Sequence, residues 1–345
     1  MINMKNMRKI LAAISILIVV SSCASPSSLV KKATTKEVER NVLTNLPGVN
    51  GPVLAVKIDD TTPAHPQVGL DSADVIYIEQ VEGGLTRLAA IFTNKVPALI
   101  GPVRSARISD LEILAQYGRV GFAYSGAQSK LRPVIEAANL ENISAERNPP
   151  SIYQTDSTRY APTNMMLDAN ALLKKTIDVE GKKIDIVKSI GWQFGKGSEL
   201  AKKLTSASVK WPAAKYSLTW STSEKRWLTT FNGKPNLDSN GRQLGPKNFV
   251  IQKVAITNSI YRDKVGGVTP LSNTVGSGTG FLLRDGKVVA INWQRPSAEV
   301  GTIWTLSDGT VANFADGQVW IALTDGEPEL IYPAPAASAS PQKSK

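Results

Sequence analysis

Short apolar runs ended by glycine, proline or a charged residue follow one another from residue 50. Runs of this length and setting are typical of buried strands, whereas amphipathic helices place apolar residues three or four positions apart. The pattern therefore predicts four buried strands in the first half of the chain. They are Val53–Ile58, Val75–Ile78, Leu88–Phe92 and Val120–Tyr124.

Helical spacing of apolar residues occurs in the same region. One stripe consists of Ile108, Leu111, Leu114 and Ala115, and another of Leu131, Val134, Ile135 and Ala138. Gly118 is typical of a helix C-terminus, and Thr163 is a candidate N-cap for a third helix that runs to Lys174 and Lys175. Strands mixed with helices indicate an α/β or α+β fold, here an N-terminal mixed-sheet α/β domain at residues 46–200.

After residue 200 the pattern changes to short alternating runs separated by tight-turn signals. The runs include Tyr216–Trp220 and Trp227–Phe231, and the turn signals are Asn232-Gly233, Asp285-Gly286, Asp308-Gly309 and Asp316-Gly317. Asn-Gly and Asp-Gly tolerate the positive φ angles of two-residue hairpin turns. We predict a smaller, mostly antiparallel β domain at residues 201–331.

The N-terminus has the order of a lipoprotein signal peptide. Three basic residues precede the apolar run Ile10–Val20, which is too short to span a bilayer alone. Val20-Ser21-Ser22-Cys23 then matches a lipobox, and Cys23 is the only cysteine. We predict a signal peptide at 1–22, and diacylglycerol and fatty acyl groups such as palmitate on Cys23. The alternative is an uncleaved membrane anchor.

The segments that flank the predicted domains have low complexity. Residues 23–45 are rich in Ser, Thr, Lys and Glu and predict a tether, and residues 332–345 predict a disordered tail. Lipid on Cys23 would hold the protein at the outer face of the cell membrane, so its first predicted partner is the membrane itself.

Composition and net charge exclude some kinds of metal site and favour some kinds of partner. The 345 residues are 42% hydrophobic and 20% charged, as in ordinary globular proteins, and the formal net charge is +11. A single Cys and a single His exclude zinc clusters and iron–sulfur ligation. The positive charge favours anionic lipid, anionic wall polymer or nucleic acid as a partner, and an exported location argues against nucleic acid.

The densest candidate site lies between residues 58 and 107. Asp59 and Glu79 end two predicted strands, Glu82 follows at a turn, and the basic residues Arg87, Arg104 and Arg107 come next. Ligands of α/β sheets bind beyond strand ends, and two guanidiniums near a helix N-terminus suit phosphate, pyrophosphate or carboxylate. The simpler alternative is that these charges pair with each other and tie strands to helix.

Two further interpretations of the acidic residues stay open. Asp59 with Glu79 or Glu82 has the composition of a general acid–base pair. Metal binding by Asp59 and Asp60 is less favoured, because adjacent residues at a strand end point to opposite faces. We therefore predict no metal, and no cofactor except Mg²⁺ if the protein transfers phosphoryl groups.

Three other features favour structural roles. His65 lies between Pro63 and Pro66 and is predicted to be a solvated loop residue. Gly276–Gly280 lacks the Lys-Ser/Thr of a phosphate-binding loop and predicts a loop leading into a hairpin. The tryptophans of the β domain are expected to pack in its core rather than to stack on sugars.

The chain resembles the YerB-type lipoprotein family, also called domain of unknown function 3048. The resemblance rests on Val53–Asp59, Pro66–Leu70, Ala73–Glu79, Glu82–Arg87, Ile100–Arg107 and Arg159–Pro162, and in the second half on Lys247–Ile251, Gly280–Trp293 and Gly317–Trp320. It implies a two-part lipoprotein on the outer face of the membrane, with no established reaction. Histidines that the family has after Arg159 and before Ser125 are missing here, which puts any activity that depends on them in doubt.

These observations predict an envelope lipoprotein that binds an anionic or glycan ligand through Arg87, Arg104, Arg107 and Arg159. Asp59, Glu79 and Glu82 would orient these arginines, or act as acid–base groups if there is catalysis. One alternative is a non-catalytic scaffold for an envelope protein complex. Another is a phosphoryl or glycosyl transferase, because LytR-CpsA-Psr phosphotransferases, which the chain also resembles faintly, place Arg and acidic residues around strand ends.

Overall fold

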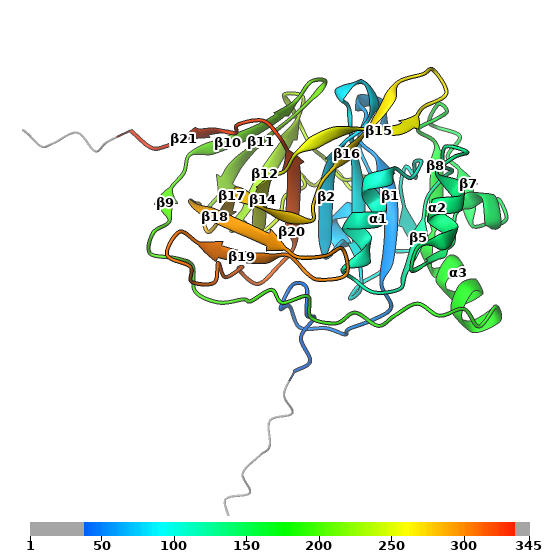
Figure 1. The fold of residues 1–345 in the computed structure, drawn as a ribbon, viewed down its shortest axis with the longest axis horizontal. Helices are drawn as coiled ribbons and strands as arrows, with labels where there is room; N and C mark the ends of the chain where they lie inside the picture. The colour runs from blue at the N-terminus through cyan, green and yellow to red at the C-terminus, as the bar shows by residue number, and fades with distance from the viewer. Residues whose placement is uncertain (1–37, 335–345) are drawn as a thin grey trace, which may run out of the picture. The chain divides into compact units, whose positions relative to one another are not determined.

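One mixed β-sheet runs through the structure, a computed structural model that describes residues 38–334 (Figure 1). Its strands follow the order β19 (Ile303–Leu306), β18 (Lys287–Arg295), β17 (Gly276–Arg284), β14 (Asn248–Lys253), β20 (Val319–Thr324), β2 (Val75–Gln80), β3 (Thr86–Phe92), β1 (Leu54–Asp59), β5 (Val120–Ala123) and β6 (Leu140–Asn142). The two-residue strand β9 (Lys202–Lys203) pairs with β18. Neighbours are antiparallel except at β14–β20, β20–β2, β1–β5 and β5–β6, which are parallel.

The four strands predicted in the first half are confirmed as β1, β2, β3 and β5. Their side chains alternate between two hydrophobic cores, one on each face of the sheet. In β1, for example, Leu54, Val56 and Ile58 lie in the first core and Ala55 lies in the second. Burial on both faces explains why these strands read as continuous apolar runs rather than as alternating ones.

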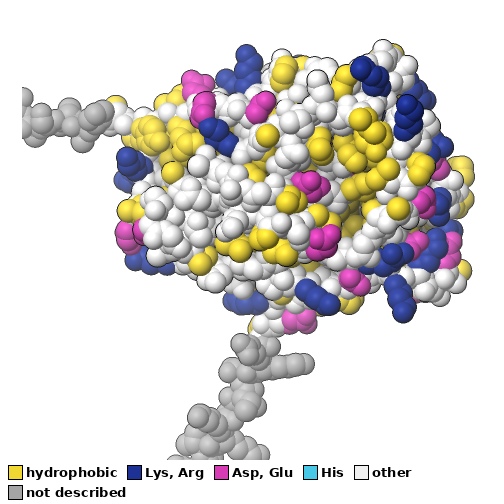
Figure 2. All heavy atoms as spheres, viewed as in Figure 1, with side chains coloured by type: hydrophobic (Ala, Val, Ile, Leu, Met, Phe, Trp, Pro, Cys, Tyr) yellow, Lys and Arg dark blue, Asp and Glu magenta, His cyan; other side chains and the backbone are white. Residues whose placement is uncertain are grey.

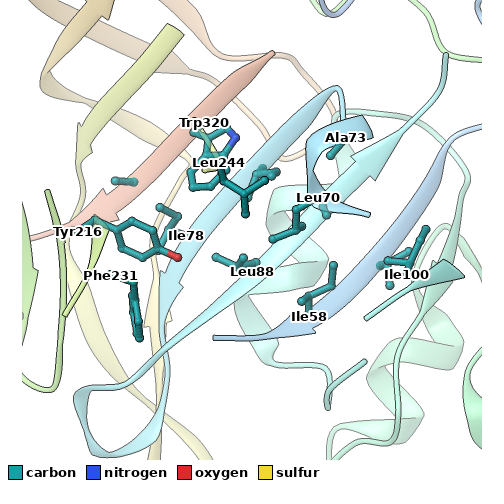
Figure 3. Packing of buried hydrophobic residues seen from close by; sticks show 14 of the residues in the cluster. Ile58, Leu70, Ala73, Ile78, Leu88, Ile100, Tyr216, Phe231, Leu244 and Trp320 are labelled. Carbon is teal, nitrogen blue, oxygen red and sulfur yellow. The ribbon is translucent and has the colours of Figure 1, made fainter. Parts of the chain in front are cut away.

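A second sheet covers the first core. It is antiparallel, in the order β13 (Lys234–Pro235), β12 (Arg226–Phe231), β11 (Ala214–Ser221), β10 (Ser206–Trp211) and β21 (Glu329–Ile331). Figure 3 shows Tyr216 and Phe231 from this sheet beside Ile78 and Leu88 of the central strands. The predicted β-rich second half is therefore present, and part of it packs on the strands of the first half.

Helices contribute less than the sequence pattern suggests. Helix α1 (Ile108–Ala115) and helix α2 (Arg132–Ala137) match the two predicted stripes and cover the second core, into which Ile113 and Ile135 project. Gly118 has a φ of +80° and follows α1, as expected. Strands predominate overall, because a second β-sheet rather than a helical layer covers the other face. The α/β prediction thus holds for the mixed sheet but overestimates the helix content.

The predicted third helix is wrong at its start. Thr163 does not cap a helix, since β8 (Met165–Asp168) follows it and lies between β4 (Leu99–Ile100) and β7 (Tyr153–Thr155). The helix α3 (Ala169–Leu173) begins later, where the Asp168 carboxylate accepts a hydrogen bond of 2.9 Å from the backbone N–H of Ala171. It continues as the π-helical segment Lys174–Val179. Single 3₁₀ turns lie at Thr62–Ala64, Leu70–Ser72, Glu82–Gly84 and Ala145–Arg147.

Tight turns occur at predicted positions. Asn232 and Gly233 have φ angles of +48° and +80° between β12 and β13, and Asp285 and Gly286 have +52° and +69° between β17 and β18. A separate hairpin of β15 (Ile256–Arg262) and β16 (Val268–Ser272) stands outside both sheets. The segment Gly276–Gly280 is the start of strand β17 rather than a loop.

Strands from both predicted domains share the central sheet. The boundary expected between residues 200 and 201 falls just before β9 and does not interrupt the sheet, and residues 38–334 belong to one compact unit. The predicted signal peptide, Cys23 and the tail beyond Ala334 lie outside the described residues. No helix within residues 38–334 is long and apolar enough to cross a membrane.

Candidate functional site

Strand pairing brings the predicted charged residues of β1, β2 and β3 into one row. Asp59 lies opposite Arg87, and Arg87 in turn lies opposite Glu79. Residues directly opposite each other in antiparallel strands project from the same face of the sheet. Here that face is the one covered by α1. Ala89 and Ile91 lie two and four residues after Arg87 in β3, so they share its face, and both belong to the second core. The sequence predicted that Asp59 and Glu79 end two strands, but it did not predict which residues face each other across the strands.

Glu79 belongs to a cluster of charged side chains that is fully buried inside the protein. Lys57, Glu79 and Asp110, which we call the lysine centre, have fully buried side chains. The ammonium of Lys57 contacts the Glu79 carboxylate and lies 2.7 Å from Oδ1 of Asp110, near the start of α1. Burial is the main reason that the pKa of Lys57 falls to about 8, against the opposing charge and hydrogen bond of Asp110.

A second cluster of charged side chains lines an open groove of about 700 Å³ beside the lysine centre. We call it the arginine groove, after Arg87, Arg104 and Arg107. Its walls come from the loop after β5, the segment before β8 and the tip of the β15–β16 hairpin. The remaining charged lining residues are Glu82, Arg132, Glu146, Asp263 and Lys264.

Backbone pairing places Arg104 and Arg107 along this groove. The N–H of Arg104 donates to the carbonyl of Lys57 at 2.8 Å, so the segment before α1 runs beside β1. The side chain of Arg104 is 25% exposed, with Nε 2.5 Å from Oδ2 of Asp59. Arg107 binds Glu82 with Nε and Nη2, at 2.9 and 2.8 Å from Oε2. These two contacts match the alternative in which the charges pair with each other.

Arg87, in contrast, does not pair with a carboxylate of residues 38–334. It is only 8% exposed, and its guanidinium donates to the carbonyl of Ser105 at 3.1 Å. Within the described residues no carboxylate oxygen lies within 4.0 Å of this guanidinium. Burial, followed by the charges of Arg107 and Arg104, lowers the pKa of Arg87 well below its ordinary value. The charges of Asp59 and Glu82 oppose this lowering but do not outweigh it. A buried cation without a direct carboxylate contact is costly, and a bound anion would reduce that cost.

Glu82 is the acidic residue of the groove lining that contacts Arg107. Burial alone would raise its pKa, but the charge and hydrogen bonds of Arg107 outweigh burial and lower the pKa of Glu82. Its carboxylate also accepts a hydrogen bond from the Thr269 hydroxyl of β16. Glu82 is therefore a charged carboxylate that already binds the Arg107 guanidinium.

The remaining predicted site residues lie elsewhere. Asp59 and Glu79 are fully buried and do not line the groove. Arg159 binds Asp156 and donates to the carbonyls of Ala64 and Pro66 at 2.9 and 2.6 Å. It therefore fastens one loop to another outside the arginine groove.

Asp60 and His65 form a separate polar cluster on the opposite face from Asp59, as the strand geometry predicted for adjacent residues. Asp60 accepts hydrogen bonds from Tyr216 at 2.7 Å and from Thr86 at 2.6 Å. His65 lies 3.2 Å from Asp60 and stacks on Phe231 with ring centroids 4.4 Å apart. The expectation of a solvated His65 is wrong, because its side chain is only 15% exposed. Residues 38–334 contain no cluster of three or more His, Cys, Asp or Glu suited to a metal.

The β half holds a second cavity that the sequence did not indicate. It measures about 750 Å³ and lies between residues 193–201 and strands β17–β19, with Leu282, Val289 and Leu306 among the apolar lining. The tryptophans expected in the core are there: Trp227, Trp293, Trp304 and Trp320 are buried, and Trp220 packs on Trp227.

Comparison with known proteins identifies the chain's relatives. Residues 43–183 match the model described as "Protein of unknown function (DUF3048) N-terminal domain", and residues 207–321 match the DUF3048 C-terminal domain. The curated "Putative lipoprotein YerB" of Bacillus subtilis (strain 168) is 44% identical over 54 residues, which is 16% of each chain. This alignment therefore covers about a sixth of the relative's length.

A solved structure extends the similarity to the fold. The crystal structure of the YerB protein from Bacillus subtilis superposes with a TM-score of 0.73, covering 84% of this chain and 99% of that one at 19% identity. At this level of identity the likeness concerns the fold alone. The overall fold is thus shared with the YerB protein.

Proposed function

This chain belongs to the DUF3048 family, whose description names no reaction, and from this premise we propose a function based on its own arginine groove. We propose that it is a lipid-anchored envelope protein that binds a multiply charged phosphate-type anion, such as pyrophosphate or a phosphorylated wall glycan, between Arg87, Arg104 and Arg107. Cys23 would carry the lipid after removal of residues 1–22, in keeping with the lipoprotein name of the relative.

The observation that carries the proposal is the unpaired Arg87. Arg104 and Arg107 each contact a carboxylate, whereas Arg87 is buried between them with one backbone acceptor. Guanidiniums bind phosphate oxygens in paired, charge-assisted hydrogen bonds. A phosphate group in the groove would supply the counter-charge that Arg87 lacks.

The geometry favours binding over transfer. A transferase would need Asp59 or Asp60 to face Arg104 across open space. Instead Asp59 is buried against Arg104, and Asp60 projects from the opposite face toward Tyr216. We therefore assign the groove a recognition role, with Mg²⁺-dependent transfer as the alternative to be tested.

The test is thermal unfolding of the chain from Val38 onward, with and without pyrophosphate. At 100 times its dissociation constant, a ligand stabilises the folded state by about 2.7 kcal/mol, enough to raise the melting temperature by a few degrees. We expect this shift to disappear in Arg87→Gln and to shrink in Arg104→Ala. The matched control is Arg242→Gln, an arginine whose side chain is 60% exposed and lies outside the groove.

Three results would change the proposal. No shift in the wild-type protein would overturn it and favour a scaffold. Equal loss of the shift in Arg242→Gln would mean that pyrophosphate binds the surface nonspecifically. A shift that requires Mg²⁺ would favour transferase chemistry. We also expect Arg87→Gln to be at least as stable as the wild type without ligand, because it removes a buried charge that no carboxylate of the described chain contacts directly.

A further inference from the structure

The tip of the β15–β16 hairpin combines exposed apolar and basic side chains. Ile260, near the end of strand β15, is 81% exposed, and Val265 in the turn is 91% exposed. Arg262 and Lys264 are exposed as well. The one acidic residue of the tip is bound to the backbone of the turn, because the Asp263 carboxylate accepts hydrogen bonds from the N–H groups of Val265 and Gly267. Figure 2 shows hydrophobic side chains bordered by Lys and Arg in the part of the view where Figure 1 draws this hairpin.

This tip forms part of the entrance to the arginine groove. Lys264 and Val265 line the groove together with Arg104, and Leu85, another partly exposed apolar residue, lines it too. Exposed apolar side chains and anion-binding arginines therefore share one opening.

The base of the hairpin is fixed. Thr269 donates a hydrogen bond to Glu82 of the groove wall, and the N–H of Ser272 donates to the hydroxyl of Ser109 in α1 at 3.0 Å. The hairpin thus holds its tip at a set position beside the groove while Ile260 and Val265 project into solvent.

We propose that this tip inserts into the surface of an anionic membrane, so that the arginine groove receives the phosphate head group of a lipid. The inference rests on the proposed function and names the ligand class of the same groove. A few apolar side chains flanked by basic ones suit an interfacial contact, in which apolar burial adds to attraction by anionic lipids. Two exposed apolar residues are too few for a stable protein interface, which buries more than about 1,000 Å².

The experiment is co-sedimentation of the chain from Val38 onward, which has no Cys23, with vesicles of phosphatidylcholine with and without phosphatidylglycerol. We expect binding only to the anionic vesicles. Ile260→Ser/Val265→Ser should weaken binding at least tenfold, and Lys264→Gln about fivefold, since one basic residue near an anionic surface contributes about that factor. The matched control is Val179→Ser/Leu200→Ser, two exposed apolar residues away from the tip.

Pyrophosphate stabilisation is measured on the same proteins to separate the two proposals. Ile260→Ser alone, at a residue that does not line the groove, should weaken binding to the vesicles and keep the full pyrophosphate shift. The membrane proposal fails if wild-type protein shifts with pyrophosphate but ignores anionic vesicles, or if tip and control variants bind vesicles equally well. Absence of the pyrophosphate shift in wild-type protein would instead reject the proposed function of the groove.

Discussion

The lysine centre and the arginine groove are built on the same three strands but handle buried charge in opposite ways. In the lysine centre one ammonium contacts two carboxylates, and all three side chains are sealed from solvent. In the groove three guanidiniums lie close together, and Arg87 is buried without a carboxylate partner while the space before it stays open. Charge that is fully paired and closed serves the fold, whereas buried charge left unpaired beside an opening is available to a ligand.

The largest effect should come from breaking the lysine centre. Lys57→Met leaves Glu79 and Asp110 buried without their cation, and removing one partner of a buried pair typically costs about 3–5 kcal/mol. Urea unfolding should show this loss. The control Lys253→Met breaks a pair with Glu327, whose side chain is 75% exposed, and should cost at most about 1 kcal/mol. Similar losses in both variants would contradict the structural role of the lysine centre.

The same centre should give the protein a distinctive pH dependence. Below pH 8 Lys57 is protonated in both states, and the cost of burying its charge is fully present. Above pH 8 the folded state releases the proton while the unfolded state holds it up to the ordinary pKa of 10.5, so stability rises with pH. The increase should approach about 1.4 kcal/mol per pH unit at most between pH 8 and 10.

Lys57→Met isolates this contribution. The difference in unfolding free energy between wild type and Lys57→Met, followed by urea titration at each pH, should grow across that range. A constant difference would show that Lys57 keeps its proton.

In the groove, removal of a carboxylate should have the opposite consequence from its removal in the lysine centre. Glu82→Gln frees Arg107 from its competing anion, so pyrophosphate should bind several times more tightly, as isothermal titration calorimetry would measure. Glu79→Gln, the matching change in the lysine centre, should lower stability and leave the affinity within about twofold. Weaker binding by Glu82→Gln would mean that Glu82 positions Arg107 for the ligand instead of competing with it.

The smallest effect on binding is expected for Arg159→Gln. Because Arg159 holds the Ala64–Pro66 loop and does not line the groove, calorimetry should give an unchanged affinity for pyrophosphate. The loss of its hydrogen bonds should appear only as lower stability, by about 1–3 kcal/mol. A tenfold loss of affinity would return Arg159 to the anion-binding set that the sequence suggested.

Features encoded locally were predictable from the sequence. The buried strands are continuous apolar runs, and Asn232-Gly233 and Asp285-Gly286 carry the residue types that tight turns require. Arg104 and Arg107 were placed together correctly because they lie three residues apart before one helix. The second sheet over the first core was not expected to replace a helical layer, since no local signal states what covers a strand.

The missed features depend on partners far apart in the chain. His65 is enclosed because Phe231 stacks on it, although the prolines around it indicated an exposed loop. Lys264 joins the groove only because a hairpin from the second half reaches it. Lys57 did carry a signal, as a lone charge inside an apolar strand, but its partner Asp110 follows from the docking of α1.

The parallel pairing of β2 with β20 has a consequence for when the protein can fold. Val75 lies opposite Val319, so the middle of the central sheet needs residues from near both ends of the described chain. A chain threaded through an export channel from its N-terminus cannot complete this sheet until the last strands have passed. Under the export that we propose for this lipoprotein, such late closure would keep the chain extended during transport and delay its final shape until the whole chain has crossed.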